Sequence, residues 1–134
     1  MRSIPTVAAV AAVVACSDAF SPTIENVAGD YHLQSLTTSQ LGSTRDWVAE
    51  GATFTISLAA NGTTTGHLFI PPATPGDSAF EADLTGTWTL SIDTVSFSQT
   101  ADSFVRDMPF LARENRLVGE DIFSGVTVRV VLTR

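Results

Sequence analysis

Phe80-Glu81-Ala82-Asp83-Leu84-Thr85-Gly86-Thr87-Trp88-Thr89-Leu90 alternates an apolar or small residue with a polar one along its whole length. A β-strand points successive side chains to opposite faces of a sheet, whereas a helix would spread both sets around its circumference. The segment therefore predicts a strand whose even-numbered residues, including Trp88, face a core. Its odd-numbered residues are expected to face water.

The same pattern of short strands and turns fills most of the chain. Asn61-Gly62 and Ser124-Gly125 supply residues that tolerate the positive φ angles of tight hairpins. Pro109 interrupts its strand and indicates an edge or a bulge, and residues 37–43 predict a loop. The predicted strands cover residues 31–36, 53–58, 63–70, 80–90, 95–98, 103–112, 116–123 and 126–133.

These segments predict an all-β fold with about eight antiparallel strands and no helix after residue 15. Strands that follow one another through short turns form a meander, and a meander of this size closes into a small barrel without exposed sheet edges. An open sandwich is the alternative architecture. The interior of an eight-stranded barrel is either just filled by side chains or holds one small ligand.

The N-terminal residues are typical of a secretory leader: Met1-Arg2, then an apolar run to Ala15 that is too short to span a bilayer. Val13-Val14-Ala15-Cys16 resembles the lipobox of bacterial lipoproteins. That resemblance implies that the Cys16 thiol takes a diacylglycerol and becomes the first mature residue. Residues 1–15 are then the signal peptide, compatible with a helix, residues 16–27 a tether, and residues 28–134 the barrel. Secretion without lipid and an uncleaved anchor are the alternatives.

A second resemblance covers most of the chain after the leader. Three segments resemble small bacterial lipocalin-like lipoproteins of the calycin type: residues 27–33 as the opening strand, residues 84–97 as the central hairpin, and residues 130–134 as the close. The resemblance implies a calycin-type β-barrel that binds a small or hydrophobic ligand. It also implies the bacterial cell envelope, and Ser17 after the lipidated position favours the outer membrane, facing the periplasm or the cell surface.

The charge of the chain excludes several classes of partner. The sequence has fourteen Asp and Glu residues against seven Arg, and it contains no Lys. Without a basic patch, neither a nucleic acid nor the surface of an anionic membrane is an expected partner. The expected contact with a membrane is the covalent lipid on Cys16, and the other expected partner is a small hydrophobic ligand or an envelope protein.

No arrangement of residues predicts a reaction. Gly-x-Ser-x-Gly and phosphate-binding glycine loops are absent from the sequence, and His32 and His67 lack further ligands at a spacing that would hold a metal. We therefore expect a protein that is not an enzyme and needs no cofactor.

A ligand site, if the barrel has one, would use its inward-facing aromatic residues. Asp121 shares a strand face with Leu117 and Phe123, so it could orient a ligand or form a hydrogen bond inside the barrel. Packed cores use the same aromatic residues as ligand pockets, so both interpretations stay open. A cavity of about 300 Å³ or more would favour a ligand carrier, and a filled interior would favour a structural or protein-interaction module. The candidate ligand-binding residues are Tyr31, Phe54, Trp88, Phe97, Phe104, Phe110 and Asp121.

Overall fold

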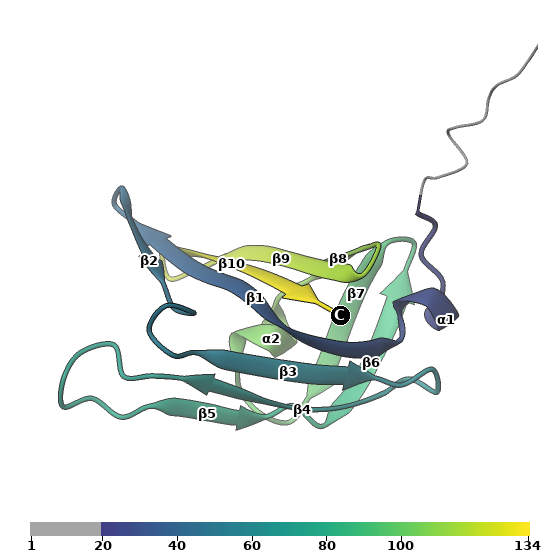
Figure 1. The fold of residues 1–134 in the computed structure, drawn as a ribbon, viewed down its shortest axis with the longest axis horizontal. Coiled ribbons are helices and arrows are strands. Elements are labelled where there is room, and N and C mark those ends of the chain that lie inside the picture. The colour runs from purple at the N-terminus through teal and green to yellow at the C-terminus, as the bar shows by residue number, and fades with distance from the viewer. Residues whose placement is uncertain (1–19) are drawn as a thin grey trace, which may run out of the picture.

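A computed structural model describes residues 20–134 of the chain, so the predicted signal peptide and Cys16 lie outside the described residues. The described part consists of ten strands and two short helices (Figure 1). In chain order these are α1 (Ile24–Val27), β1 (Gly29–Gln40), β2 (Ser43–Asp46), β3 (Thr53–Leu58), β4 (Thr63–Ile70), β5 (Phe80–Asp83), β6 (Gly86–Ser91), β7 (Thr94–Gln99), α2 (Phe104–Asp107), β8 (Phe110–Arg113), β9 (Arg116–Phe123) and β10 (Val126–Thr133).

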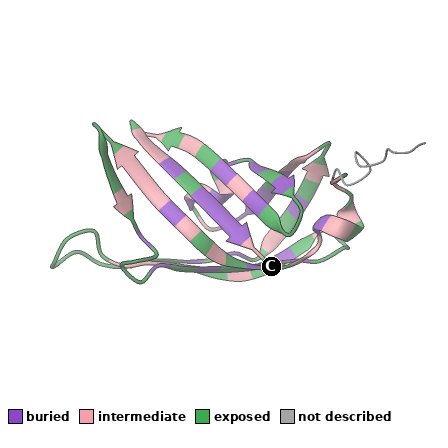
Figure 2. Ribbon diagram, turned by 45° about the horizontal axis from the view of Figure 1, so that its top comes forward, coloured by how far each residue is buried: buried purple, intermediate pink, exposed green. Residues whose placement is uncertain are grey.

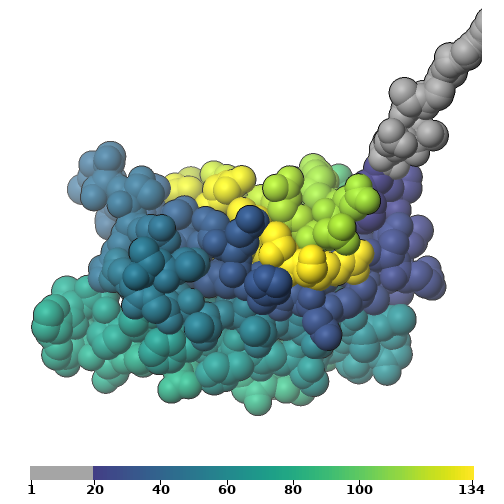
Figure 3. All heavy atoms as spheres, viewed as in Figure 1, coloured from purple at the N-terminus to yellow at the C-terminus, as the bar shows by residue number. Residues whose placement is uncertain are grey.

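The strands form a closed antiparallel barrel. β2 and β3 both pair with β1 and together make one interrupted strand; β5 and β6 both pair with β4 and make a second. Counted this way, eight strands follow one another around the barrel in chain order. The ring closes where β10 pairs with β1, from His32 opposite Thr133 to Ser39 opposite Thr127. Figure 3 shows β10 lying between β1 and β9 on the surface. The predicted barrel is confirmed, and the open sandwich is excluded.

The alternation of apolar and polar residues that predicted the strands corresponds to an alternation of buried and exposed residues in the structure (Figure 2). Ala82, Leu84 and Trp88 are buried, and the odd-numbered residues of the segment are exposed. Phe80, which the pattern placed toward the core, is 42% exposed, so the prediction is wrong for this residue. The sheet is interrupted between β5 and β6, yet the Leu84 carbonyl oxygen accepts hydrogen bonds from the Thr64 hydroxyl (2.8 Å) and the Gln99 amide (3.1 Å). Because these side chains replace the missing ladder partner, the interruption leaves that buried carbonyl satisfied.

The first difference from the sequence prediction is α1, which lies within the predicted tether. Thr23 caps this helix. Its hydroxyl accepts a hydrogen bond from the backbone amide of Asn26, and the side-chain oxygen of Asn26 accepts one from the backbone amide of Thr23. Val27, at the end of the helix, is 1% exposed. Residues 24–27 therefore belong to the folded domain, because a capped turn and one buried side chain fix them against the barrel.

The second difference is α2, where residues 103–112 predicted one strand. The Ser103 hydroxyl accepts a hydrogen bond from the Val105 amide and caps a single helical turn, and Pro109 follows two residues after its end. Val105 and Met108 are almost fully buried. The strand prediction is wrong for the first half of this segment and correct for β8.

The barrel has one closed end and one open end. At the closed end the connections are the short turns between β3 and β4, β6 and β7, and β8 and β9. Both ends of the described chain also lie there, next to α1 (Figure 1). The Tyr31 hydroxyl donates to the Val27 carbonyl (2.6 Å), and the Arg134 guanidinium lies 5.4 Å from the centre of the Tyr31 ring. Arg134 also donates to the carbonyls of Asn26 and Ala28, and these hydrogen bonds hold α1 against the closed end of the barrel.

Candidate functional site

The open end of the barrel contains an apolar recess of about 130 Å³. Its walls come from three strands (β1, β4 and β10), from α2 and from the connection between β2 and β3, and the only polar wall residue is a threonine. We call it the mouth recess. The residues that line it are Leu36, Thr38, Trp47, Ile70, Phe104 and Val128.

The interior below the mouth recess is filled by side chains. Phe54 is 1% exposed and meets the edge of the Phe104 ring, with 6.4 Å between the ring centres. Met108 and Phe110 fill the space over Gly119, where even a methyl group would lie within 3 Å of both. The recess is thus smaller than the cavity of about 300 Å³ typical of drug-sized ligands. It matches the size of cavity that holds a single benzene ring.

A network of polar contacts holds Trp47 in the wall of the recess. The indole nitrogen of Trp47 donates to the Thr38 hydroxyl (2.9 Å), and the Arg45 guanidinium lies 4.1 Å from the centre of the indole ring. Arg45 in turn donates two hydrogen bonds of 2.6 Å to the Glu50 carboxylate. These bonds lower the pKa of Glu50 and raise that of Arg45, because each side chain stabilises the charged form of the other. Both side chains of this pair are partly exposed, so the ion pair contributes little stability of its own. Its role is to position the indole ring.

Two open hollows adjoin the mouth recess. One, of about 380 Å³, shares Thr38 and Trp47 with it and extends over the β1–β2 hairpin. The other, of about 410 Å³, shares Phe104 with it and is lined by Phe80, Asp102, Ser103, Phe104, Asp107 and Phe123. We call the second one the phenylalanine hollow. A ligand whose apolar group occupied the recess could therefore extend over the rim in either direction.

The candidate residues named from the sequence are divided between the core and this site. Phe104 lines the recess, and Phe54 lies directly beneath it. Phe97 and Phe110 pack edge to face, with 5.4 Å between ring centres, and both are buried. Tyr31 and Trp88 are core residues; the Trp88 indole nitrogen donates to the Ala59 carbonyl (2.7 Å).

Two polar residues also lie on inward-facing positions. Asp121 is half-buried, pairs in register with Val128 of the recess wall, and accepts a hydrogen bond from the Ile122 amide (2.8 Å). Gln99 is 7% exposed, and its Oε1 is the one buried side-chain polar atom of residues 20–134 without a hydrogen-bond partner.

Sequence reasoning missed most of the recess. Trp47 follows Arg45 at a spacing of two, so an Arg-x-Trp pair in an otherwise polar segment was the available signal for a cation stacked on an indole. Ile70 and Val128 carry no such signal, because aliphatic residues at strand ends are common in any barrel.

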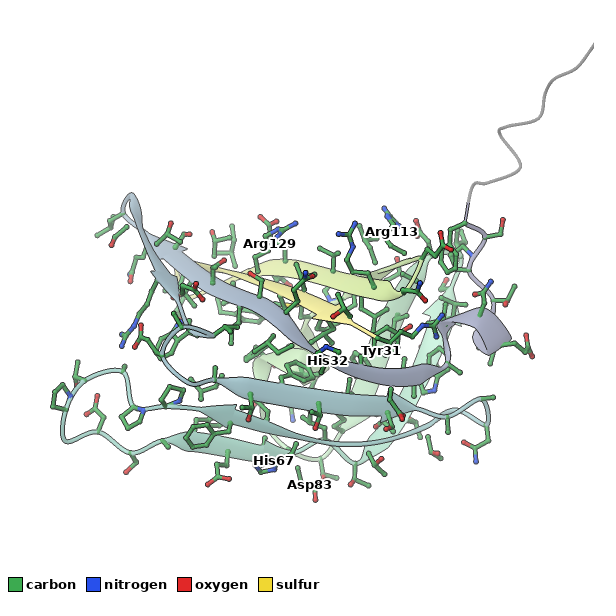
Figure 4. All side chains as sticks on the ribbon, viewed as in Figure 1. Tyr31, His32, His67, Asp83, Arg113 and Arg129 are labelled. Carbon is green, nitrogen blue, oxygen red and sulfur yellow. The ribbon has the colours of Figure 1, made fainter. Side chains whose placement is uncertain are left out.

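The outer surface offers weaker candidates. A shallow depression of about 290 Å³ adjoins Gly66, where the backbone of β3 approaches so closely that a Cβ atom would clash with the Thr55 carbonyl. His67 Nε2 and Glu81 Oε1 lie within hydrogen-bond distance on the exposed surface (2.9 Å), and Figure 4 shows His67 and Asp83 pointing away from the barrel. Hydrogen bonds from Thr85 lower the pKa of Asp83. Within residues 20–134, no group of three or more His, Cys, Asp or Glu side chains could hold a metal ion. Neither helix of this part is long and apolar enough to cross a membrane.

Comparisons with known family models, curated proteins and solved structures found no match to this chain. The assignment of the candidate site therefore rests on the geometry of this structure alone.

Proposed function

We propose that this protein is a lipid-anchored protein of the bacterial cell envelope, with a lipocalin-like barrel that binds a small apolar group of a ligand in the mouth recess. It binds the ligand without converting it. The observation that carries the binding proposal is the recess itself, since its walls are apolar and it opens to solvent. The observation that carries the anchor is Val13-Val14-Ala15-Cys16 at the end of the apolar leader.

The size and chemistry of the mouth recess support a small ligand group. Ligand pockets are concave and mostly apolar, with a few polar groups that fix orientation. Here the polar groups are the Thr38 hydroxyl and the Arg45–Glu50 pair, which lie beside the Trp47 ring. A group of one ring or a few carbons gains little binding energy, so we expect a dissociation constant near the millimolar range, which corresponds to about −4 kcal/mol.

Nuclear magnetic resonance tests the binding proposal directly. The chain has two tryptophans, and only Trp47 lines the recess, so the Trp88 indole signal serves as an internal control. On titration with 2-phenylethanol, we expect the Trp47 indole signal to move in a saturable way and the Trp88 signal to stay in place. A Trp47 signal that does not move with millimolar ligand would contradict the proposal.

A matched pair of variants locates the ligand. Ile70→Phe fills the mouth recess with a ring, whereas Ile122→Phe makes the same change at a residue that is 65% exposed outside the recess. We expect the first variant to weaken binding about tenfold or more, equal to about 1.4 kcal/mol, and the second to leave it unchanged. Equal effects of the two variants would place the ligand elsewhere.

The anchor is tested separately in a bacterial host. Cys16→Ser should release the protein from the membrane fraction and abolish its labelling with a fatty acid, because the thiol that would take the lipid is gone. Two or three acyl chains hold a protein firmly on a bilayer, whereas one holds it only marginally. Membrane association that survives the substitution would rule out the lipid anchor.

A structural or protein-interaction module is the second candidate function. The filled interior below the recess favours it, as does the small volume of the recess, about 130 Å³. It predicts that neither the Trp47 nor the Trp88 signal responds to 2-phenylethanol.

A further inference from the structure

The phenylalanine hollow combines aromatic rings with carboxylates. Phe104 separates it from the mouth recess, and Phe80 and Phe123 form its other apolar walls. Asp102 and Asp107 line the same hollow. Both side chains are well exposed, at 88% and 51%, so their carboxylates are available to a ligand at the rim.

The positive charges near this end of the barrel already have partners. Arg106 donates to Asp102 (2.8 Å) and to Asp107 (3.2 Å), in each case to Oδ1. One guanidinium therefore faces two carboxylates, and the second oxygen of each carboxylate stays free of Arg106. Arg45, the other cation beside the recess, donates to the Glu50 carboxylate through two nitrogens and also to the Ala73 carbonyl. Among residues 20–134, Asp121 has no ion-pair partner. The rim thus carries more negative than positive charge.

We propose that the ligand is a small organic cation, with its apolar end in the mouth recess and its protonated amine in the phenylalanine hollow. This inference rests on the proposed ligand binding and names the class of ligand. An ammonium group is attracted to the faces of aromatic rings and to carboxylates. The carboxylates of Asp102 and Asp107 would repel a ligand that carries a carboxylate, and the acidic surface of the whole protein would add to that repulsion.

The expected preference is moderate because the rim is solvated. An exposed ion pair and an exposed cation–π contact are each weak. Together they predict that a cation binds about tenfold more tightly than a neutral ligand of the same shape, equal to about 1.4 kcal/mol. Added salt should reduce this preference, since exposed charges are screened within about 10 Å at 0.1 M ionic strength.

Three ligands with the same phenyl group test the inference at pH 7: 2-phenylethylamine, 2-phenylethanol and 3-phenylpropanoate. The Trp47 indole signal of the folded protein reports the binding of each. We expect affinity to fall in that order, and the gap between the first two to narrow between 20 and 500 mM salt. If none of the three binds, the proposed ligand binding itself fails. If the alcohol or the acid binds as tightly as the amine, only the inference about the cation fails.

Two double variants distinguish the effect of the carboxylates in the hollow from the effect of the net charge of the protein. Asp102→Asn with Asp107→Asn removes both carboxylates of the hollow. Glu25→Gln with Glu114→Gln removes the same charge at the closed end, on α1 and in the turn between β8 and β9. We expect the first pair to remove most of the preference for the amine, leaving the share of the aromatic rings, while 2-phenylethanol still binds, which also shows that the variant is folded. The second pair should keep the whole preference. A preference that is unchanged in the first pair, or is reduced equally in both, overturns the inference.

Discussion

Gly119→Ala tests how tightly the barrel interior is packed beneath the mouth recess. Gly119 lies on β9 and faces inward, and its φ angle is not in the region that favours glycine. At a position of this kind, alanine would ordinarily stabilise a protein by about 0.4–1 kcal/mol, because it restricts the unfolded chain. Here a Cβ atom would lie 2.6 Å from the Met108 sulfur and 2.8 and 2.9 Å from two ring carbons of Phe110.

The ring of Phe110 sets the cost. The Met108 side chain is flexible and can move aside, whereas Phe110 is fully buried and held by the edge-to-face contact with Phe97. Overpacking of a tight core costs about 1–3 kcal/mol. After the gain from alanine is subtracted, we expect Gly119→Ala to lower the free energy of unfolding by about 1–2 kcal/mol.

Urea denaturation followed by circular dichroism measures this loss. In a Phe110→Leu background the ring is absent, so Gly119→Ala should cost at least about 1 kcal/mol less than in the parent protein. The reasoning is refuted if Gly119→Ala is as stable as the parent, or if it costs the same in both backgrounds.

Two further predictions concern the core. Trp88→Ala should lower the free energy of unfolding by about 3–5 kcal/mol, because it removes a ring that is 3% exposed and one of the two hydrogen bonds to the Ala59 carbonyl, which keeps the bond from the Gly62 amide. A loss below about 1 kcal/mol would show that the ring contributes little to the core. Burial raises the pKa of Tyr31, and Arg134 lowers it by a smaller amount. The stability that depends on the neutral hydroxyl is therefore complete below about pH 10, the usual pKa of tyrosine, and is lost as the pH rises through the higher folded value. Tyr31 is the only tyrosine, so absorbance at 295 nm follows its ionisation directly, and Tyr31→Phe should remove this part of the alkaline loss of stability.

The sequence predicted the strands well where a period of two was strong. Residues 53–58 and 80–90 have to turn one face to the core, and that requirement is visible in the order of their residues. The Asn61-Gly62 turn was equally visible, because it uses residues that tolerate positive φ. The tight turn at Leu41-Gly42, by contrast, could not be recognised from the sequence. Leu41 adopts a φ of 50°, which costs a leucine energy and leaves no sequence signal. Residues 37–43 were therefore predicted as a loop, whereas β1 continues to Gln40 and β2 begins at Ser43.

The mouth recess could not be predicted for a different reason. Its walls meet only because β10 pairs with β1, which brings Val128 opposite Thr38. That contact joins the two ends of the domain, and no local pattern specifies it. α2 adds to the difficulty, since a single turn of helix is too short to show a helical period. The sequence thus predicts a barrel interior lined with aromatic residues, but not which of them face solvent.

The position of α1 has a consequence for the direction from which a ligand arrives. Anything joined to the domain through the residues before Phe20 is joined at the end opposite the mouth recess (Figure 1). If a lipid holds the N-terminus in a bilayer, the barrel entrance points toward the aqueous compartment. A ligand would then enter the barrel from the aqueous phase. To take a ligand from the bilayer that holds the anchor, the domain would have to rotate so that its entrance faced the membrane.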